Sequence, residues 1–205
     1  MTNVLLSEYI NRDVEVLDHE DSLRDLLKIM VEKKHFNVII NKEESVFIVT
    51  AQHIINAYVH KHSLDAPIST LSLKKTLLYT ESSLLQNLYH HDFTHCDYIC
   101  ITDDDCAIFG ILSASDLHSL IDPSQMMKNR QIGHFIFRKL PKSLDVTVNV
   151  EFAFQMICER SDDAIIVVDD ERAVGIFSTQ DALRLLLNGY DNDRPIGTYM
   201  TTPIH

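Results

Sequence analysis

The chain has 205 residues with 45% hydrophobic content, enough for one large core or several small ones, and its formal net charge at pH 7 is −12. Such an acidic chain lacks the dense basic face that nucleic acid or an anionic membrane surface needs, so neither is expected as a partner. No apolar run approaches the roughly 18 residues of a membrane span, no basic signal-peptide region begins the chain, and the four cysteines form no disulfide-like framework. We therefore expect a cytoplasmic protein without membrane insertion.

The predicted elements recur in one order, β-α-β-β-α, three times along the chain. Each repeat is expected to begin with a short strand and an amphipathic helix, and to continue with two apolar strands that an acidic turn separates. A second helix ends each repeat. The expected first strands are 14–16, 76–79 and 145–148. The expected helices are 22–33, 51–59, 82–90, 114–121, 150–159 and 179–187.

These patterns divide the chain into repeat 1 (1–65), repeat 2 (66–130), repeat 3 (131–193) and a tail (194–205). Equivalent isoleucines lie 64 residues apart, at Ile68, Ile132 and Ile196. The tail copies the segment that leads into a repeat. We therefore expect either a longer protein with a fourth repeat or a tail that pairs back as a lone strand. Because a repeat of this size buries little core alone, the repeats should pack against one another.

A polar pair follows the last strand of repeat 3. Ser178 and Asp181 lie where the strand meets the helix, in the order S-x-x-D. Ser178 can cap the helix, and the same helix end suits a phosphate. Asp181 can accept two hydrogen bonds from a vicinal diol such as that of ribose. The junction is therefore either a plain helix cap or a site for an adenine nucleotide or adenosine derivative.

Repeat 2 has the same arrangement at Ser113 and Asp116. The last strand of each of these two repeats also carries a glycine, Gly110 or Gly175, which leaves room for the close approach of backbone or ligand.

Repeat 1 departs from this pattern. Phe47 replaces the glycine and His53 replaces the aspartate. Because an imidazole cannot supply a carboxylate, repeat 1 is expected to have lost nucleotide binding, and Thr50 is expected to be only a helix cap.

The turn "VVDD", the strand "VGI" and the S-x-x-D junction of repeat 3, together with "GILSASDL" in repeat 2, resemble the CBS domain (cystathionine-β-synthase motif). Units of this family pair into what is called a Bateman module. The resemblance implies an α/β (α+β) fold of tandem β-α-β-β-α units packed in pairs through their sheets. It also implies that the aspartates contact ribose, that the serines contact phosphate, and that adenine lies between apolar residues of the sheet. The implied ligands are AMP, ADP, ATP or S-adenosylmethionine, and no cofactor is required.

The sequence offers no other cluster from which a metal site or a catalytic site is expected. The segment "YHHDFTHCD", residues 89–97, contains residue types that bind zinc, but its spacing does not match a structural site, so no metal site is expected. No nucleophile elbow, Walker loop or HExxH motif occurs, so no catalytic residue and no enzymatic activity are expected.

Three functions remain open. The first is a non-catalytic regulatory module that senses an adenosyl ligand and transmits its occupancy to a partner or a downstream output domain. The second is a structural or dimerising role, in which apolar helices such as "ALRLLL" form a homodimer interface. The third is a regulatory fragment of a longer enzyme or transporter.

Overall fold

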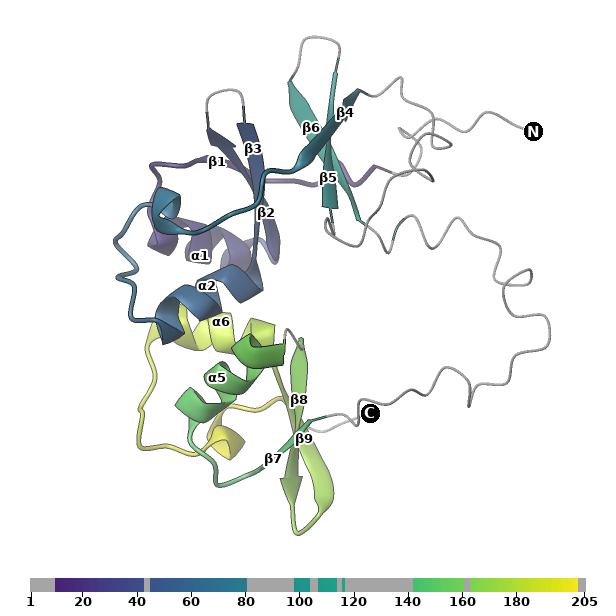
Figure 1. Cartoon of the computed structure of the whole chain (residues 1–205). Helices are drawn as coiled ribbons and strands as arrows, with labels where there is room; N and C mark the ends of the chain where they lie inside the picture. Colours follow the sequence, from purple (N-terminus) through teal and green to yellow (C-terminus); the bar gives the residue numbers. More distant parts are fainter. Residues whose placement is uncertain are drawn as a thin grey trace, which may run out of the picture. The chain divides into compact units, whose positions relative to one another are not determined.

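The computed structural model describes residues 10–42, 45–80, 98–103, 107–113, 116, 142–160 and 163–202. Three three-stranded sheets and four α-helices lie within these ranges (Figure 1). Repeat 1 contributes β1 (Val16–Asp18), α1 (Leu23–Glu32), β2 (Asn37–Lys42), β3 (Ser45–Thr50) and α2 (Ala51–Val59). Repeat 2 contributes β4 (Leu77–Thr80), β5 (Tyr98–Thr102) and β6 (Ile108–Ser113). Repeat 3 contributes β7 (Ser143–Asp145), α5 (Val150–Arg160), β8 (Ala164–Asp169), β9 (Arg172–Ser178) and α6 (Thr179–Asn188).

The sheets share one topology, with orders β1-β2-β3, β4-β5-β6 and β7-β8-β9. In repeats 2 and 3 the first two strands are parallel and the last two are antiparallel. A parallel pair needs a crossover connection, which α5 provides between β7 and β8. The described elements of repeats 1 and 3 follow the predicted order β-α-β-β-α. The predicted helices at 82–90 and 114–121 lie outside the described residues, except for Asp116.

The first strands of repeats 1 and 3 differ from prediction. We expected strands at 14–16 and 145–148, whereas β1 ends at Asp18 and β7 ends at Asp145. The Asp18 carboxylate accepts the N–H of Glu20 at 2.9 Å, and that of Asp145 accepts the N–H of Thr147 at 2.9 Å. An aspartate that bonds to the backbone two residues on starts a turn. The prediction of a strand over 145–148 is therefore wrong beyond its first residue.

The described chain forms two compact units that cut across the repeats. The first unit contains the sheet of repeat 2 and parts of β2 and β3. The second contains α1, α2 and the described elements of repeat 3. Among the described residues, no helix has both the length and the apolar composition that crossing a membrane would require.

The core of the first unit joins the sheets of two repeats. It consists of Ile39, Val46 and Ile48 from repeat 1 with Cys100 and Ile111 from repeat 2, all buried. Backbone contacts flank this cluster, since Thr76 donates its N–H to Val46 at 2.8 Å, and Asn11 exchanges two 3.0 Å hydrogen bonds with Ile111. Repeats 1 and 2 therefore pair through their sheets, as the sequence predicted.

The core of the second unit joins helices of repeats 1 and 3. Helix α2 contacts α5 and α6, and α1 contacts α6 (Figure 1). Tyr58 of α2 packs edge-on against Phe154 of α5, with ring centroids 5.8 Å apart. The hydroxyl groups of Tyr58 and Tyr190 are 2.9 Å apart. Such aromatic pairs stabilise by more than their buried area alone, by about 0.5–1.5 kcal/mol each.

Candidate functional site

The junction of repeat 3 is a complete capping box. Ser178, in extended conformation (φ −102°, ψ 167°), caps α6 and accepts the N–H of Asp181 at 3.2 Å. In return the Asp181 carboxylate accepts the N–H of Ser178 at 2.9 Å and its hydroxyl at 2.7 Å. Both return bonds end on the same atom, Oδ2. The cap therefore uses one carboxylate oxygen only.

The other oxygen of Asp181, Oδ1, faces two further groups. The Thr201 hydroxyl donates to it at 3.3 Å, and the Arg184 guanidinium lies 3.8 Å away. The Asp181 side chain is only 10% exposed, whereas that of Arg184 is 47% exposed. Oδ1 is therefore a shielded acceptor between a hydroxyl and a half-exposed cation.

Gly175 allows the tail to lie against β9. The backbone of Thr201 exchanges two hydrogen bonds with Ile176, at 3.0 and 2.8 Å, in an antiparallel bridge. A Cβ at position 175 would collide with the Met200 side chain and would lie 3.1 Å from the Thr201 carbonyl oxygen. The close approach expected at this glycine is thus made by the chain itself, and it brings Thr201 to the junction.

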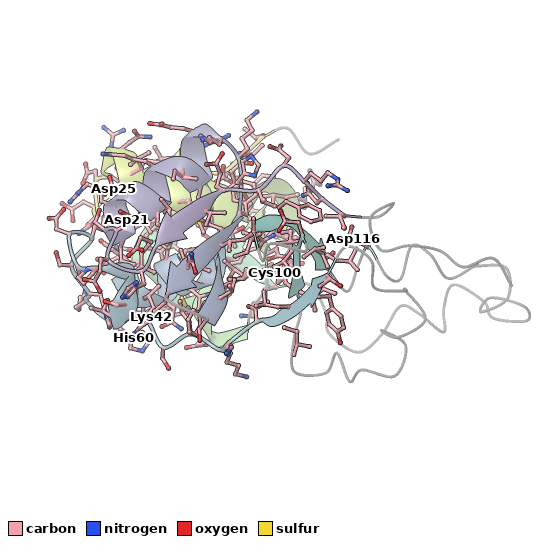
Figure 2. All side chains as sticks on the ribbon, turned by 90° about the horizontal axis from the view of Figure 1, so that it is seen from above. Asp21, Asp25, Lys42, His60, Cys100 and Asp116 are labelled. Carbon is pink, nitrogen blue, oxygen red and sulfur yellow. The ribbon has the colours of Figure 1, made fainter. Side chains whose placement is uncertain are left out.

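Repeat 2 reproduces this geometry. The Asp116 Oδ2 accepts the N–H of Ser113 at 2.8 Å and its hydroxyl at 2.7 Å, and Ser113 accepts the N–H of Asp116 at 3.1 Å. Figure 2 labels Asp116 beside the strands of repeat 2. A Cβ at Gly110 would collide with Ile10 and would lie 3.0 Å from the Asn11 carbonyl oxygen. Residues 10 and 11 therefore occupy the place beside β6 that Met200 and Thr201 occupy beside β9.

Repeat 1 builds its cap from an imidazole. His53 Nδ1 lies 3.1 Å from the N–H of Thr50 and 2.9 Å from the Thr50 hydroxyl oxygen. A backbone N–H can only donate, so Nδ1 must carry a lone pair and the proton of the neutral ring must sit on Nε2. Burial lowers the pKa of His53, which favours this neutral form. Thr50 therefore acts as a cap, and the junction offers a ring N–H where repeat 3 offers Oδ1.

A further S-x-x-D pair, which our sequence analysis did not note, caps α1. The Ser22 hydroxyl donates to the Asp25 carboxylate at 2.6 Å and accepts the N–H of Asp25 at 3.1 Å. This hydrogen bond lowers the pKa of Asp25. The Asp25 side chain is 55% exposed and its ion pair with Lys28 is 3.6 Å long. The motif alone therefore indicates a cap. The junctions after β9 and β6 differ from it because Asp181 is buried and Asp116 is half-buried.

Thr201 and Arg184 are the neighbours of Asp181 that sequence reasoning missed. Arg184 could have been found, because it follows Asp181 by three residues and so lies on the same face of α6. Thr201 lies 20 positions further along the chain and carries no such signal. Among the described residues, no group of His, Cys, Asp and Glu is arranged to hold a metal ion. The His- and Cys-containing segment 89–97 lies outside the described residues.

Comparisons with known proteins match a family model to the first part of the chain. Residues 6–60 match the family model described as the CBS domain. No curated protein sequence matches the chain significantly. The chain is similar in structure to MJ1225 from Methanocaldococcus jannaschii, described as a proposed archaeal homologue of g-AMPK, with 14% identity, a TM-score of 0.73, and coverage of 98% of this chain and 84% of that one.

Two more structures are less similar. TA0289 from Thermoplasma acidophilum, a CBS domain protein, is 13% identical with a TM-score of 0.49, over 85% of this chain and 86% of that one. PAE2072 from Pyrobaculum aerophilum, a CBS domain protein complexed with AMP, is 13% identical with a TM-score of 0.47, over 61% of this chain and 97% of that one. The match identifies a CBS domain in residues 6–60, and the chain as a whole has the fold of a CBS tandem repeat.

Proposed function

We propose that this CBS protein is a non-catalytic regulatory module that binds an adenosyl ligand and passes the occupancy of its site to a partner or a downstream domain. The ligand class is AMP, ADP, ATP or S-adenosylmethionine. The binding residues are Ser178, Asp181 and Gly175 in repeat 3, with Ser113, Asp116 and Gly110 as their counterparts in repeat 2.

The proposal rests on one observation: the two carboxylate oxygens of Asp181 have different hydrogen-bond partners. Oδ2 is used by the cap, and within the described part of the chain Oδ1 accepts a single hydrogen bond, a long one of 3.3 Å from the Thr201 hydroxyl, beside the Arg184 guanidinium. A ribose diol has two hydroxyl donors and can bond to an ionised carboxylate oxygen without disturbing the cap. Capping and ligand binding are therefore compatible in one side chain.

The energies favour exchange of the Thr201 hydroxyl for a ligand. Hydrogen bonds to a charged group contribute about 1.5–3 kcal/mol at good geometry. The Thr201 bond is longer than the usual hydroxyl–carboxylate distance of about 2.5–2.7 Å, so losing it costs less. A well-placed ribose hydroxyl would therefore gain more at Oδ1 than the displaced threonine loses.

The same contact suggests how occupancy is transmitted. Thr201 touches Asp181 through its side chain and β9 through its backbone. A ligand that takes Oδ1 competes with the side-chain contact and so alters how firmly the tail is held against β9. A ligand can shift such an equilibrium only by the difference between its affinities for the two arrangements.

A structural function is the competing candidate, and one observation favours it. The junctions at Thr50, Ser113 and Ser178 are all capped by the protein's own side chains, and repeat 1 achieves this without a carboxylate. On this interpretation the repeats serve only to pair with one another or to dimerise.

Asp181→Asn separates the two functions. The amide oxygen can keep the cap bonds to Ser178, while the amide nitrogen replaces Oδ1 and removes the acceptor. We expect calorimetry with AMP, ATP and S-adenosylmethionine to show an affinity loss of about 1–3 kcal/mol, roughly 5- to 160-fold, with little change in the melting temperature. Asp116→Asn tests repeat 2 in the same way.

Asp25→Asn is the matched control, because it alters the same capping motif at an exposed helix start. It should leave ligand affinity unchanged. A wild-type protein that gains no thermal stability from any of these ligands would favour the structural function, since binding at a hundredfold excess over Kd should add about 2.7 kcal/mol. Consumption of the nucleotide over time would instead reveal an enzyme.

A further inference from the structure

We propose that Arg184 makes the repeat 3 junction select a 5′-phosphorylated adenosine over unphosphorylated adenosine and over S-adenosylmethionine. This inference rests on the proposed function, since it assigns the ligand class of the same site. It makes Arg184 a specificity-determining residue.

The position of Arg184 fits a phosphate at the same ligand. The residue lies on α6, three positions after Asp181, and its guanidinium is 3.8 Å from Oδ1, the oxygen proposed to hold the ribose diol. Its side chain is 47% exposed, whereas that of Asp181 is 10% exposed. A ligand whose ribose reaches the shielded oxygen would therefore carry its 5′ group past a solvent-accessible cation.

The other repeats lack this charge. Six positions after the capping residue, repeat 3 has Arg184, repeat 2 has Ser119 and repeat 1 has Asn56. The chain as a whole carries a formal charge of −12, so its long-range field opposes the approach of an anion. A local cation is therefore needed to bind a phosphate, and among the three equivalent positions only repeat 3 supplies one.

The existing ion pair does not prevent this function. The contact is long at 3.8 Å and its arginine side chain is 47% exposed, so it is weak although the Asp181 side chain is shielded. A phosphate offers the guanidinium a planar two-point contact with charge-assisted hydrogen bonds, which are about twice as strong as neutral ones. The sulfonium and ammonium groups of S-adenosylmethionine would instead be repelled by the arginine.

A similar pair at the plain cap of α1 provides an internal control. Lys28 follows Asp25 by three residues, at 3.6 Å, but that aspartate is 55% exposed. Loss of Lys28 should therefore remove a comparable surface ion pair without touching the ligand.

The experiment measures the ratio of AMP affinity to adenosine affinity by calorimetry, in an Asp116→Asn background that leaves repeat 3 as the remaining site. Adenosine that binds too weakly for direct titration is measured by displacement of AMP. We expect Arg184→Ser, the residue of repeat 2, to lower AMP affinity about tenfold or more and to change adenosine affinity less than about twofold. Arg184→Lys should restore part of the AMP affinity, and Lys28→Ser should leave both affinities unchanged.

Each contrary outcome has its own meaning. Equal losses for AMP and adenosine in Arg184→Ser would make Arg184 a structural residue and overturn the inference while the proposed function stands. AMP binding that disappears in the Asp116→Asn background would place the ligand in repeat 2, with the same consequence. A wild-type protein that binds neither AMP, adenosine nor S-adenosylmethionine would overturn the proposed function and this inference together.

Discussion

At the start of α2, His53 Nδ1 accepts the N–H of Thr50 at 3.1 Å, and at the start of α6, Asp181 Oδ2 accepts the N–H of Ser178 at 2.9 Å. The two helices thus begin with the same hydrogen-bond pattern built from different chemical groups. In both junctions one acceptor atom serves both the backbone N–H and the hydroxyl of the capping residue. A carboxylate is therefore not required for capping at this place in the fold.

The difference lies in the rest of each side chain. The remaining imidazole nitrogen of His53 is a donor, whereas the remaining carboxylate oxygen of Asp181 is an acceptor that faces Thr201 and Arg184. A diol can donate to the second but not to the first. Repeat 1 thereby shows the junction with a ring N–H as its second group, and repeat 3 shows the same junction with a second acceptor.

The largest expected effect comes from closing the space that only a glycine leaves beside the tail. Gly175→Val would push against Met200 and the Thr201 carbonyl, whereas repeat 1 carries Phe47 at the equivalent position. Overpacking of this kind costs about 1–3 kcal/mol, so we expect a clear loss in the free energy of unfolding in urea. Ala173→Val, on an exposed position of β9, should change it by less than about 0.5 kcal/mol. If both variants changed the free energy of unfolding equally, the packing of the tail against β9 would not depend on Gly175.

Removing the capping partner should affect the two junctions unequally. Asp181→Ala leaves the N–H of Ser178 and the hydroxyl of Thr201 without their acceptor, and we expect a loss of about 2 kcal/mol. His53→Ala removes only the cap and should cost about 1 kcal/mol. In double-mutant cycles with Thr201→Val, Asp181 should couple to Thr201 by about 0.5–1.5 kcal/mol and His53 should not couple. Absence of coupling at Asp181 would show that the 3.3 Å contact contributes nothing.

The smallest effect is a pH dependence of the repeat 1 junction. Burial lowers the pKa of His53 below its ordinary value of 6.5, so below that pH the unfolded chain binds a proton that the folded chain resists. The stability contributed by the neutral ring is therefore complete above 6.5 and is lost as the pH falls through the folded-state pKa. We expect a loss of up to about 1 kcal/mol, the usual contribution of a helix cap, in unfolding curves between pH 7 and 5.

His53→Asp is the matched variant, because it installs the capping partner of repeats 2 and 3. Its stability relative to wild type should rise as the pH falls over this window, since an aspartate stays ionised there. A pH dependence that is the same in both proteins would assign the effect to another titrating group.

Much of the fold could be predicted from periodicity. The helix at 51–59 is observed with the predicted bounds, and those at 22–33, 150–159 and 179–187 are observed to within one residue. These segments have apolar residues on one helical face and polar caps at their ends, and both signals are local. The ends of β1 and β7 were missed because a single aspartate side chain turned the backbone.

The capping residues of the junction were equally readable, since Ser178 and Asp181 are three positions apart and the helix brings them together. The S-x-x-D pattern could not separate a plain cap from a shielded junction, because Ser22 and Asp25 satisfy it at an exposed cap. Burial separates these cases, and burial depends on how distant segments pack.

The local order of strands, helices and caps in each repeat follows from patterns within a few residues, because helix and strand periodicity and side-chain capping act over one or two turns of the chain. The segments that pack against each face of a strand or helix do not follow from such local patterns. Strands β2 and β3 are apolar on both faces, and no local feature says that Ile39, Val46 and Ile48 meet the sheet of repeat 2 while α2 meets the helices of repeat 3. The surroundings of Asp181 Oδ1 were also decided by tertiary structure, because the bridge between Ile176 and Thr201 carries a hydroxyl to it from 20 residues away.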